Sequence, residues 1–215
     1  MSHSPFVSLE APHFSPLSKA RLHSMVGAMD TPEVVERDTE EPRVDIYAFK
    51  RNMKACSAEA LGVDGHLLVT SGMSDRLMVP PQGLSNPGTL AIELLWYVRD
   101  LNPEYFAALR WLSKLPFVDN TWFGFGHTVR MPQPPLSFCP FRHFLLLPSV
   151  VKADQRLFTH LKQQGHAIGT LAVHMLAEPE YALVKTREGL KAFLDLLDGK
   201  KYALLFNPER QSLLI

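Results

Sequence analysis

Residues 89–98 read Thr-Leu-Ala-Ile-Glu-Leu-Leu-Trp-Tyr-Val, and this stretch decides the fold. Successive side chains of a strand point to opposite faces of a sheet, so both faces of this segment are apolar apart from Glu93. Residues 168–177 form a second run that is almost continuously apolar. Strands that are covered on both faces belong in the middle of a sheet. We therefore expect these two segments to be central strands.

Shorter strands are predicted around this centre. In residues 43–50, Val44, Ile46 and Ala48 alternate with another set of side chains, which is typical of a strand with one face better buried. The region from Trp122 to Phe141 is rich in Gly and Pro, and only residues 128–130 look extended enough for an edge strand. The remaining predicted strands are 67–70, 144–147 and a closing hairpin made by 201–207 and 211–214.

Helices are predicted at four places where apolar residues recur with a period of 3.6. The first ends near Asp30, and the second begins at Asn102-Pro103-Glu104, where Asn is a good N-cap and Pro suits the first helical position. The third covers 153–164 and ends before Gly165; the fourth uses Thr186 as its cap and ends before Gly199. Their apolar stripes are Leu22, Met25, Val26 and Met29; Phe106, Leu109, Leu112 and Leu115; Leu157, Phe158 and Leu161; and Leu190, Phe193, Leu194 and Leu197.

This order of elements predicts the α+β class, with a mixed, mainly antiparallel β-sheet packed against helices. Residues 1–16 are rich in Ser, Pro and His without periodicity and are interpreted as a flexible N-terminal arm. Residues 17–215 are interpreted as a single domain, since nothing in the chain reads as a long linker.

Composition argues against several classes of protein. The chain has 22 basic and 22 acidic residues, so it lacks the positive charge that draws proteins to nucleic acid or anionic membranes. A secretory signal and an apolar run of about 20 residues are both missing from the sequence, so we expect a cytoplasmic protein. Cys56 and Cys139 are too far apart for a zinc or redox motif, and neither a cofactor nor a metal is expected.

Catalytic candidates in the sequence are weak. Ser71 or Cys139 with a histidine such as His127 would be the nucleophile and base of a small hydrolase, but the strained Gly-x-Ser-x-Gly elbow is missing. His174 falls on the predicted strand 168–177 and is interpreted as a packed core histidine, since zinc needs at least three converging ligands.

Residues 68–78 read Leu-Val-Thr-Ser-Gly-Met-Ser-Asp-Arg-Leu-Met and resemble the strand-and-turn signature of suppressor-of-fused domain proteins. Other short motifs follow in the order that this family shows, and the resemblance extends over about residues 43–214. These motifs are Glu93-Leu94, the helix around Trp111, Gly126-His127-Thr128 and Phe144-Leu145-Leu146.

The resemblance implies a mixed α/β domain without a catalytic set. The family turn is Thr70, Ser71, Gly72, Met73 and Ser74, and we expect Gly72 to take a positive φ there. Many bacterial members look like immunity or accessory proteins encoded beside toxins, and animal relatives bind a transcription factor.

The leading hypothesis is therefore a non-catalytic protein-binding module, and more specifically an immunity or accessory protein that binds and neutralises a cognate toxin. Trp122 and Phe123, beside the Gly- and Pro-rich loops, are the first candidates for its interface. The alternatives are the hydrolase and a stand-alone intracellular regulator. The partner and the oligomeric state are not specified by the sequence.

Overall fold

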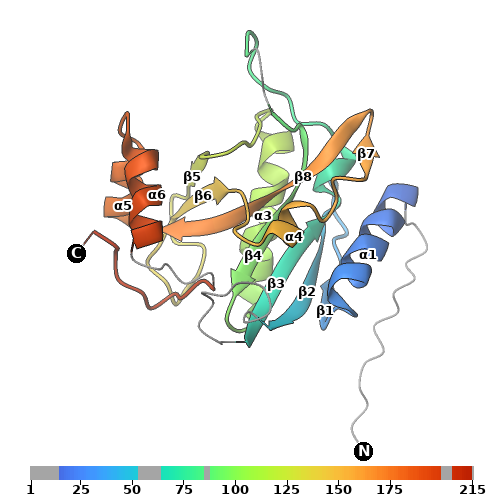
Figure 1. Cartoon of the computed structure of the whole chain (residues 1–215), viewed down its shortest axis with the longest axis horizontal. Coiled ribbons are helices and arrows are strands. Elements are labelled where there is room, and N and C mark those ends of the chain that lie inside the picture. Colours follow the sequence, from blue (N-terminus) through green and yellow to red (C-terminus); the bar gives the residue numbers. More distant parts are fainter. Residues whose placement is uncertain (1–14, 53–63, 85–87, 200–204, 215) are drawn as a thin grey trace, which may run out of the picture.

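The computed structural model describes residues 15–52, 64–84, 88–199 and 205–214 (Figure 1). Almost all of the arm predicted at residues 1–16 lies outside the described residues, and the first helix begins at Pro16 with Ser15 as its N-cap. The strands are β1 (Val34–Glu36), β2 (Asp45–Asn52), β3 (Asp64–Ser71), β4 (Ala91–Val98), β5 (Thr128–Arg130), β6 (His143–Leu147), β7 (Lys162–Gln163) and β8 (His166–Leu176). The helices are α1 (Pro16–Met29), the 3₁₀ turn η1 (Met73–Asp75), α3 (Pro103–Val118), α4 (Lys152–Gln155), α5 (Glu178–Val184) and α6 (Gly189–Gly199).

One mixed sheet organises the described part of the chain, with strand order β1-β2-β3-β4-β8-β6-β5 and β7 paired to β8. The β4–β8 pair is parallel, with Leu94 opposite Leu171, and the other strand pairs are antiparallel. The two long apolar segments are thus neighbours at the centre, as predicted, and 128–130 is an edge strand. The α+β class with a mainly antiparallel sheet is confirmed.

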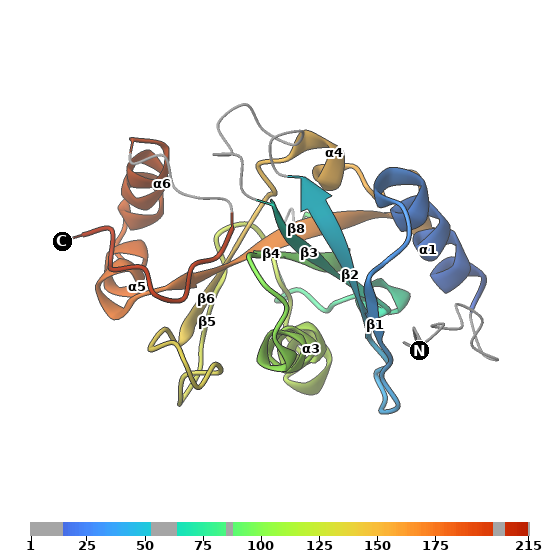
Figure 2. The ribbon, with the colours of Figure 1, turned by 90° about the horizontal axis from the view of Figure 1, so that it is seen from below.

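Helices cover both faces of the sheet (Figure 2). On one face, α3 packs on an apolar cluster that includes Trp96, Leu112 and Phe144. On the other face, α1 and α4 lie over the β2–β4 side, and α5 with α6 lies over the β6 side. The prediction that one face of the strand in residues 43–50 is better buried is wrong, because side chains on both faces of β2 are buried. No helix among the described residues has both the length and the apolar character needed to cross a bilayer.

The predicted helix at 153–164 is wrong beyond Gln155. Leu157 and Phe158 are buried, but they lie in turns, and the chain then enters the β7–β8 hairpin. Gln164 and Gly165 form its two-residue loop, with φ of 48° and 85°. Positive φ at both loop residues is the geometry that suits a tight hairpin, so Gly165 reverses the chain here and does not end a helix.

The prediction at Thr186 is also wrong, because a further helix, α5, precedes α6. The Thr186 hydroxyl donates a hydrogen bond to the Leu183 carbonyl (2.8 Å) at the end of α5, and α6 begins only at Gly189. A Cβ at Gly189 would overlap the Leu183 carbonyl, so a residue without a side chain lets the two helices join closely. The apolar stripe predicted for the last helix does face the core, with Phe193 fully packed.

The prediction of a closing hairpin is wrong for the residues of it that the structure describes. Residues 201–204 lie outside the described residues, and 211–214 are irregular. Instead, Phe206 makes a single parallel bridge to Val98, and its amide donates a hydrogen bond to the Tyr97 carbonyl (2.8 Å). Its ring lies 5.7 Å from the ring of Trp96. The C-terminal segment is therefore held by a buried aromatic side chain.

Replacing Phe206 by Ala should lower the free energy of unfolding by about 3–5 kcal/mol, because it empties a buried aromatic site. Urea unfolding followed by tryptophan fluorescence would measure this loss. The control is Leu214→Ala, at a residue that is 41% exposed, which should change stability by less than about 0.5 kcal/mol. Equal small effects for both variants would show that the segment is not anchored through Phe206.

His174 makes the fold sensitive to acid. Burial on β8, reinforced by the positive charge of Arg210, lowers its pKa from 6.5 to about 4. Between these values the unfolded chain binds a proton that the folded chain does not, so stability falls as the pH drops through this window. Urea titrations at pH 7 and at pH 4 measure this effect. Over this range we expect the free energy of unfolding of the His174→Gln variant to fall by on the order of 3 kcal/mol less than that of the parent protein. Identical losses would contradict this.

Candidate functional site

The family-like turn lies directly after β3. Strand β3 ends at Ser71, Gly72 has a φ of 130°, and η1 begins at Met73. A Cβ at Gly72 would overlap the carbonyl oxygen of Arg43 on the neighbouring chain segment. Both observations explain why the sequence has Gly at this position, since it tolerates positive φ and allows the close approach.

The turn surrounds the carboxylate of Glu93, which is fully buried on β4. The hydroxyls of Thr70 and Ser74 donate hydrogen bonds to it at 2.7 and 2.6 Å. The backbone amides of Gly72 and Ser74 donate two more, both at 3.0 Å. A buried carboxylate is tolerated only when it is hydrogen-bonded and charge-compensated, so the turn meets the first of these requirements.

Arg21 of α1 supplies the compensating charge. Its Nε lies 3.4 Å from Glu93 Oε1 and donates a hydrogen bond to Ser71 Oγ at 2.9 Å. Its Nη1 donates to Ser74 Oγ and to Asp75 Oδ1, at 3.0 and 2.6 Å. Burial by itself would lower the pKa of Arg21, but the carboxylates of Glu93 and Asp75 outweigh burial and raise it. The cluster therefore fixes α1 to β3 and β4 through charge.

We expect Glu93→Gln to lower the free energy of unfolding by about 3–5 kcal/mol, because the neutral amide cannot accept all four hydrogen bonds that the buried carboxylate accepts, and Arg21 keeps only Asp75 as its counter-charge. The double variant Arg21→Met/Glu93→Gln should lose less than the sum of the single losses, since the two side chains act as a pair. Chemical denaturation would measure both, with Glu188→Gln on the exposed α5–α6 turn as control. Additive losses would contradict the pairing.

The hydrolase residues are not brought together. Ser71 Oγ accepts a hydrogen bond from Arg21, and the hydrogen bonds within the described residues join neither Ser71 nor Cys139 to a histidine. Cys139 is 3% exposed, and burial raises the pKa of its thiol, which favours the unreactive protonated form. Cys56 lies outside the described residues. The described part of the chain contains no group of three or more His, Cys, Asp or Glu placed to hold a metal ion.

The edge strand β5 has backbone groups that no other described strand pairs with. Two backbone hydrogen bonds bracket the β5–β6 pair, with the Met131 amide donating to the Arg142 carbonyl and the Leu146 amide donating to the His127 carbonyl. In an antiparallel pair, alternate residues bond inward. The amide and carbonyl groups of Thr128 therefore point away from β6, as do those of residue 130, and no hydrogen bond within the described residues uses them.

A hollow lies on each side of this edge. The one on the α3 side has a volume of about 380 Å³. Its lining includes Trp111, Leu115, Trp122, Thr128, Val129 and Arg130. The one on the α5 side has a volume of about 350 Å³ and is lined by Gly126, His127, Thr128, Val184 and Lys185. Both hollows contain His127 and Thr128, so they meet at the outer edge of β5.

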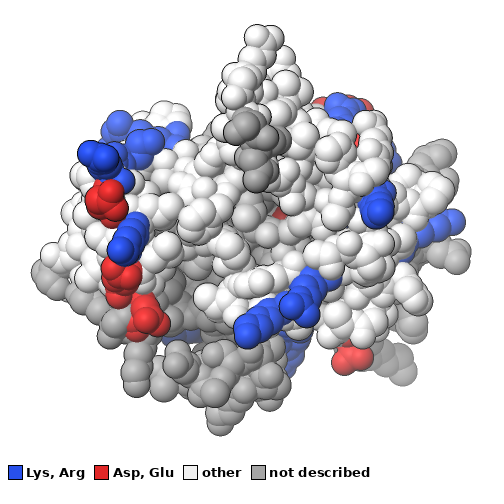
Figure 3. Space-filling model, turned by 45° about the horizontal axis from the view of Figure 1, so that its top comes forward, with Lys and Arg blue, Asp and Glu red and all other residues white. Residues whose placement is uncertain are grey.

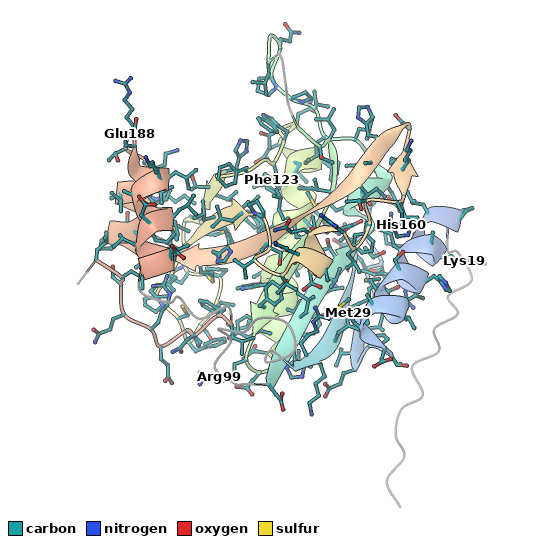
Figure 4. The ribbon with its side chains drawn as sticks, in the orientation of Figure 1. Lys19, Met29, Arg99, Phe123, His160 and Glu188 are labelled. Atoms are coloured by element: carbon teal, nitrogen blue, oxygen red, sulfur yellow. The ribbon has the colours of Figure 1, made fainter. Side chains whose placement is uncertain are left out.

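The two aromatic residues predicted as an interface have different environments. Phe123 is 3% exposed and belongs to the apolar core, near β5 and α3 (Figure 4). Trp122 is half-buried on the wall of the hollow, with its ring 4.3 Å from that of His127. Of the two side chains, Trp122 is therefore the one that solvent reaches.

His127 is a neutral side chain at this edge. Burial lowers its pKa, the hydrogen bond between its Nδ1 and the Trp122 carbonyl acts in the opposite direction, and the nearby Lys185 lowers it further. Nδ1 is thus the nitrogen that carries the proton in the neutral ring, since a carbonyl only accepts.

A protein-family model, the suppressor of fused protein, matches residues 40–211. The chain belongs to the suppressor of fused family. A comparison with curated protein sequences gives no match.

Solved suppressor of fused structures share the fold. A homologue from Neisseria gonorrhoeae superposes with a TM-score of 0.63 at 15% identity, covering 92% of this chain and 96% of that one. A crystal structure of a Sufu–Fu complex gives 0.68 at 13% identity, covering 93% of each chain. Drosophila Suppressor of Fused gives 0.63 at 11% identity, covering 91% of this chain and 50% of that one.

Several residues of this suppressor of fused domain were missed by sequence reasoning. Arg21 sits one position before the predicted apolar stripe of its helix, and Lys185 and Arg130 carry no motif. For Arg21 the sequence offers one signal, which is the isolated acid Glu93 in the apolar run 89–98. A buried carboxylate requires a basic partner somewhere in the chain.

Proposed function

We propose that this protein is a non-catalytic protein-binding module that pairs an extended segment of its partner with β5. The observation that carries the proposal is the outward-facing backbone of Thr128 and Arg130 between two hollows. An extended peptide can continue a sheet at such an edge, where main-chain hydrogen bonds supply affinity and flanking pockets receive alternate side chains.

The other edge of the sheet is less suited to this role. At β1, the Arg110 guanidinium lies 2.7 Å from the Glu36 carboxylate and also contacts the Glu36 carbonyl oxygen (3.4 Å). Charged side chains over an edge protect it from pairing with other chains. At β5, by contrast, the hollow beside the edge exposes Trp111, which is 39% exposed.

The family supports a binding role. One of the similar structures is a complex of Sufu with Fu, so a protein of this fold is found with a protein partner. For this chain we further propose the role of an immunity or accessory protein in the cytoplasm, with a cognate toxin as its partner. A stand-alone intracellular regulator is the other candidate, and the same edge would serve it.

The geometry favours binding over hydrolysis. Catalysis by a serine or cysteine requires a base in hydrogen-bond reach of the nucleophile, whereas binding requires only a complementary surface. Here Ser71 is bonded to Arg21 within a structural cluster, and the thiol of Cys139 is buried.

Selection of a random peptide library on the purified protein tests strand pairing at β5. Thr128→Pro removes the outward amide, and Pro is accepted on edge strands where the amide faces solvent. We expect selected peptides to bind this variant at least tenfold more weakly. Thr128→Ala keeps the amide and should bind as the parent does. Equal binding to the proline and alanine variants would contradict strand pairing; thermal unfolding checks that both remain folded.

Substitution in the α3-side hollow gives a second measurement that leaves the strand intact. Trp111→Ala should weaken binding by about 2 kcal/mol, as truncation of an aromatic hot spot does. Val150→Ala, at an exposed residue (67%) outside the hollow, is the matched control and should leave affinity unchanged. Titration calorimetry with one selected peptide would measure both. An unchanged affinity for Trp111→Ala would place the peptide elsewhere.

A further inference from the structure

The two sides of the β5 edge differ in chemistry. Val129 is opposite Phe144, whose side chain lies in the cluster under α3. Thr128 is opposite Leu145, which packs beneath α5 and α6. Because side chains alternate along a strand, Arg130 leaves the sheet on the same side as Thr128.

The α5 side of the edge is basic. Arg130 and Lys185 are both exposed, and no ion pair within the described residues uses either of them. Glu178, an acid at the start of α5, is already held by Arg142 and His143, at 2.7 and 2.9 Å. Figure 3 shows Lys and Arg side chains together with Asp and Glu side chains at the left, over α5 and α6, beside a largely uncharged surface.

The α3 side of the edge is mainly aromatic and aliphatic. Its hollow is lined by Trp111, Trp122, Leu115 and Val129, with Asp119 as its acidic residue, and Arg130 borders it from the edge strand. An apolar side chain placed there would leave water and gain roughly 25 cal/mol for each Å² of apolar surface that it buries. The two hollows therefore favour side chains of different kinds.

We propose that the segment bound at β5 carries an Asp or Glu facing Arg130 and Lys185 and, at an adjacent position, a large apolar residue facing the Trp111–Trp122 hollow. This inference rests on the proposed function, because it assumes strand pairing. The adjacent spacing follows from the pleat, since neighbouring residues of a paired strand point to opposite faces and align with the side chains of β5.

The two side chains have different effects on binding. The apolar residue supplies most of the affinity, whereas the acid pairs with exposed cations and contributes modestly to affinity. The acid contributes to partner selection, because electrostatic complementarity speeds encounter and disfavours basic segments. Binding should therefore weaken as salt rises, since exposed charges are screened.

The test is the sequence content of peptides selected from a random library by the parent and by charge-reversed proteins. The parent should enrich an acid next to Leu, Phe or Trp. Arg130→Glu/Lys185→Glu should enrich Lys or Arg in place of the acid and keep the apolar residue. Lys152→Glu, an exposed reversal on α4, is the control and should select the same peptides as the parent.

Affinities of one selected peptide complete the test. Lys185→Gln should weaken binding about fivefold, and changing the peptide acid to its amide should then have little further effect. Peptides that depend on the Thr128 amide but carry no acid would overturn this inference and leave strand pairing standing. A library that yields no peptide dependent on that amide would contradict strand pairing and the acidic assignment together.

Discussion

A buried carboxylate on the central strand is the constraint on which the rest of the structure depends. Glu93 lies at the centre of the sheet and is fully buried, where an uncompensated charge would be very costly. The Thr70–Ser74 turn and Arg21 of α1 together satisfy it. One acid thus joins the helix before the sheet, the turn after β3 and the central strand, and this explains the residues of the family-like motif in physical terms.

This arrangement separates the stabilising part of the molecule from its proposed recognition surface. The centre of the sheet is covered on both faces and fixed by charge, while β5 lies at the far end and makes ladder contacts only through β6. A rigid sheet holds the short edge strand in an extended form. A partner segment that pairs with β5 as proposed would meet a preformed template, so less conformational entropy would be lost on binding.

Sequence reasoning was wrong where local and long-range preferences disagreed. Residues 153–164 have a helical spacing of apolar side chains, but the Gln164-Gly165 turn and pairing with β8 stabilise a hairpin instead. Phe206 lies in a run that reads as a strand, yet it anchors an irregular segment in an aromatic cluster. In both places a tertiary contact outweighed a local propensity.

The sequence by itself determined the two central strands, the helix capped by Asn102, the turn at Gly72 and the suppressor of fused resemblance, because periodicity, capping and glycine geometry act within a few residues. Only the tertiary structure decided that Arg21 meets Glu93 and that Trp122 is half-buried while Phe123 is buried. It also decided that Ser71 is hydrogen-bonded to Arg21 and not to a histidine that could activate it. Those outcomes depend on contacts between segments distant in the chain, and a single sequence carries no local signal for such pairings.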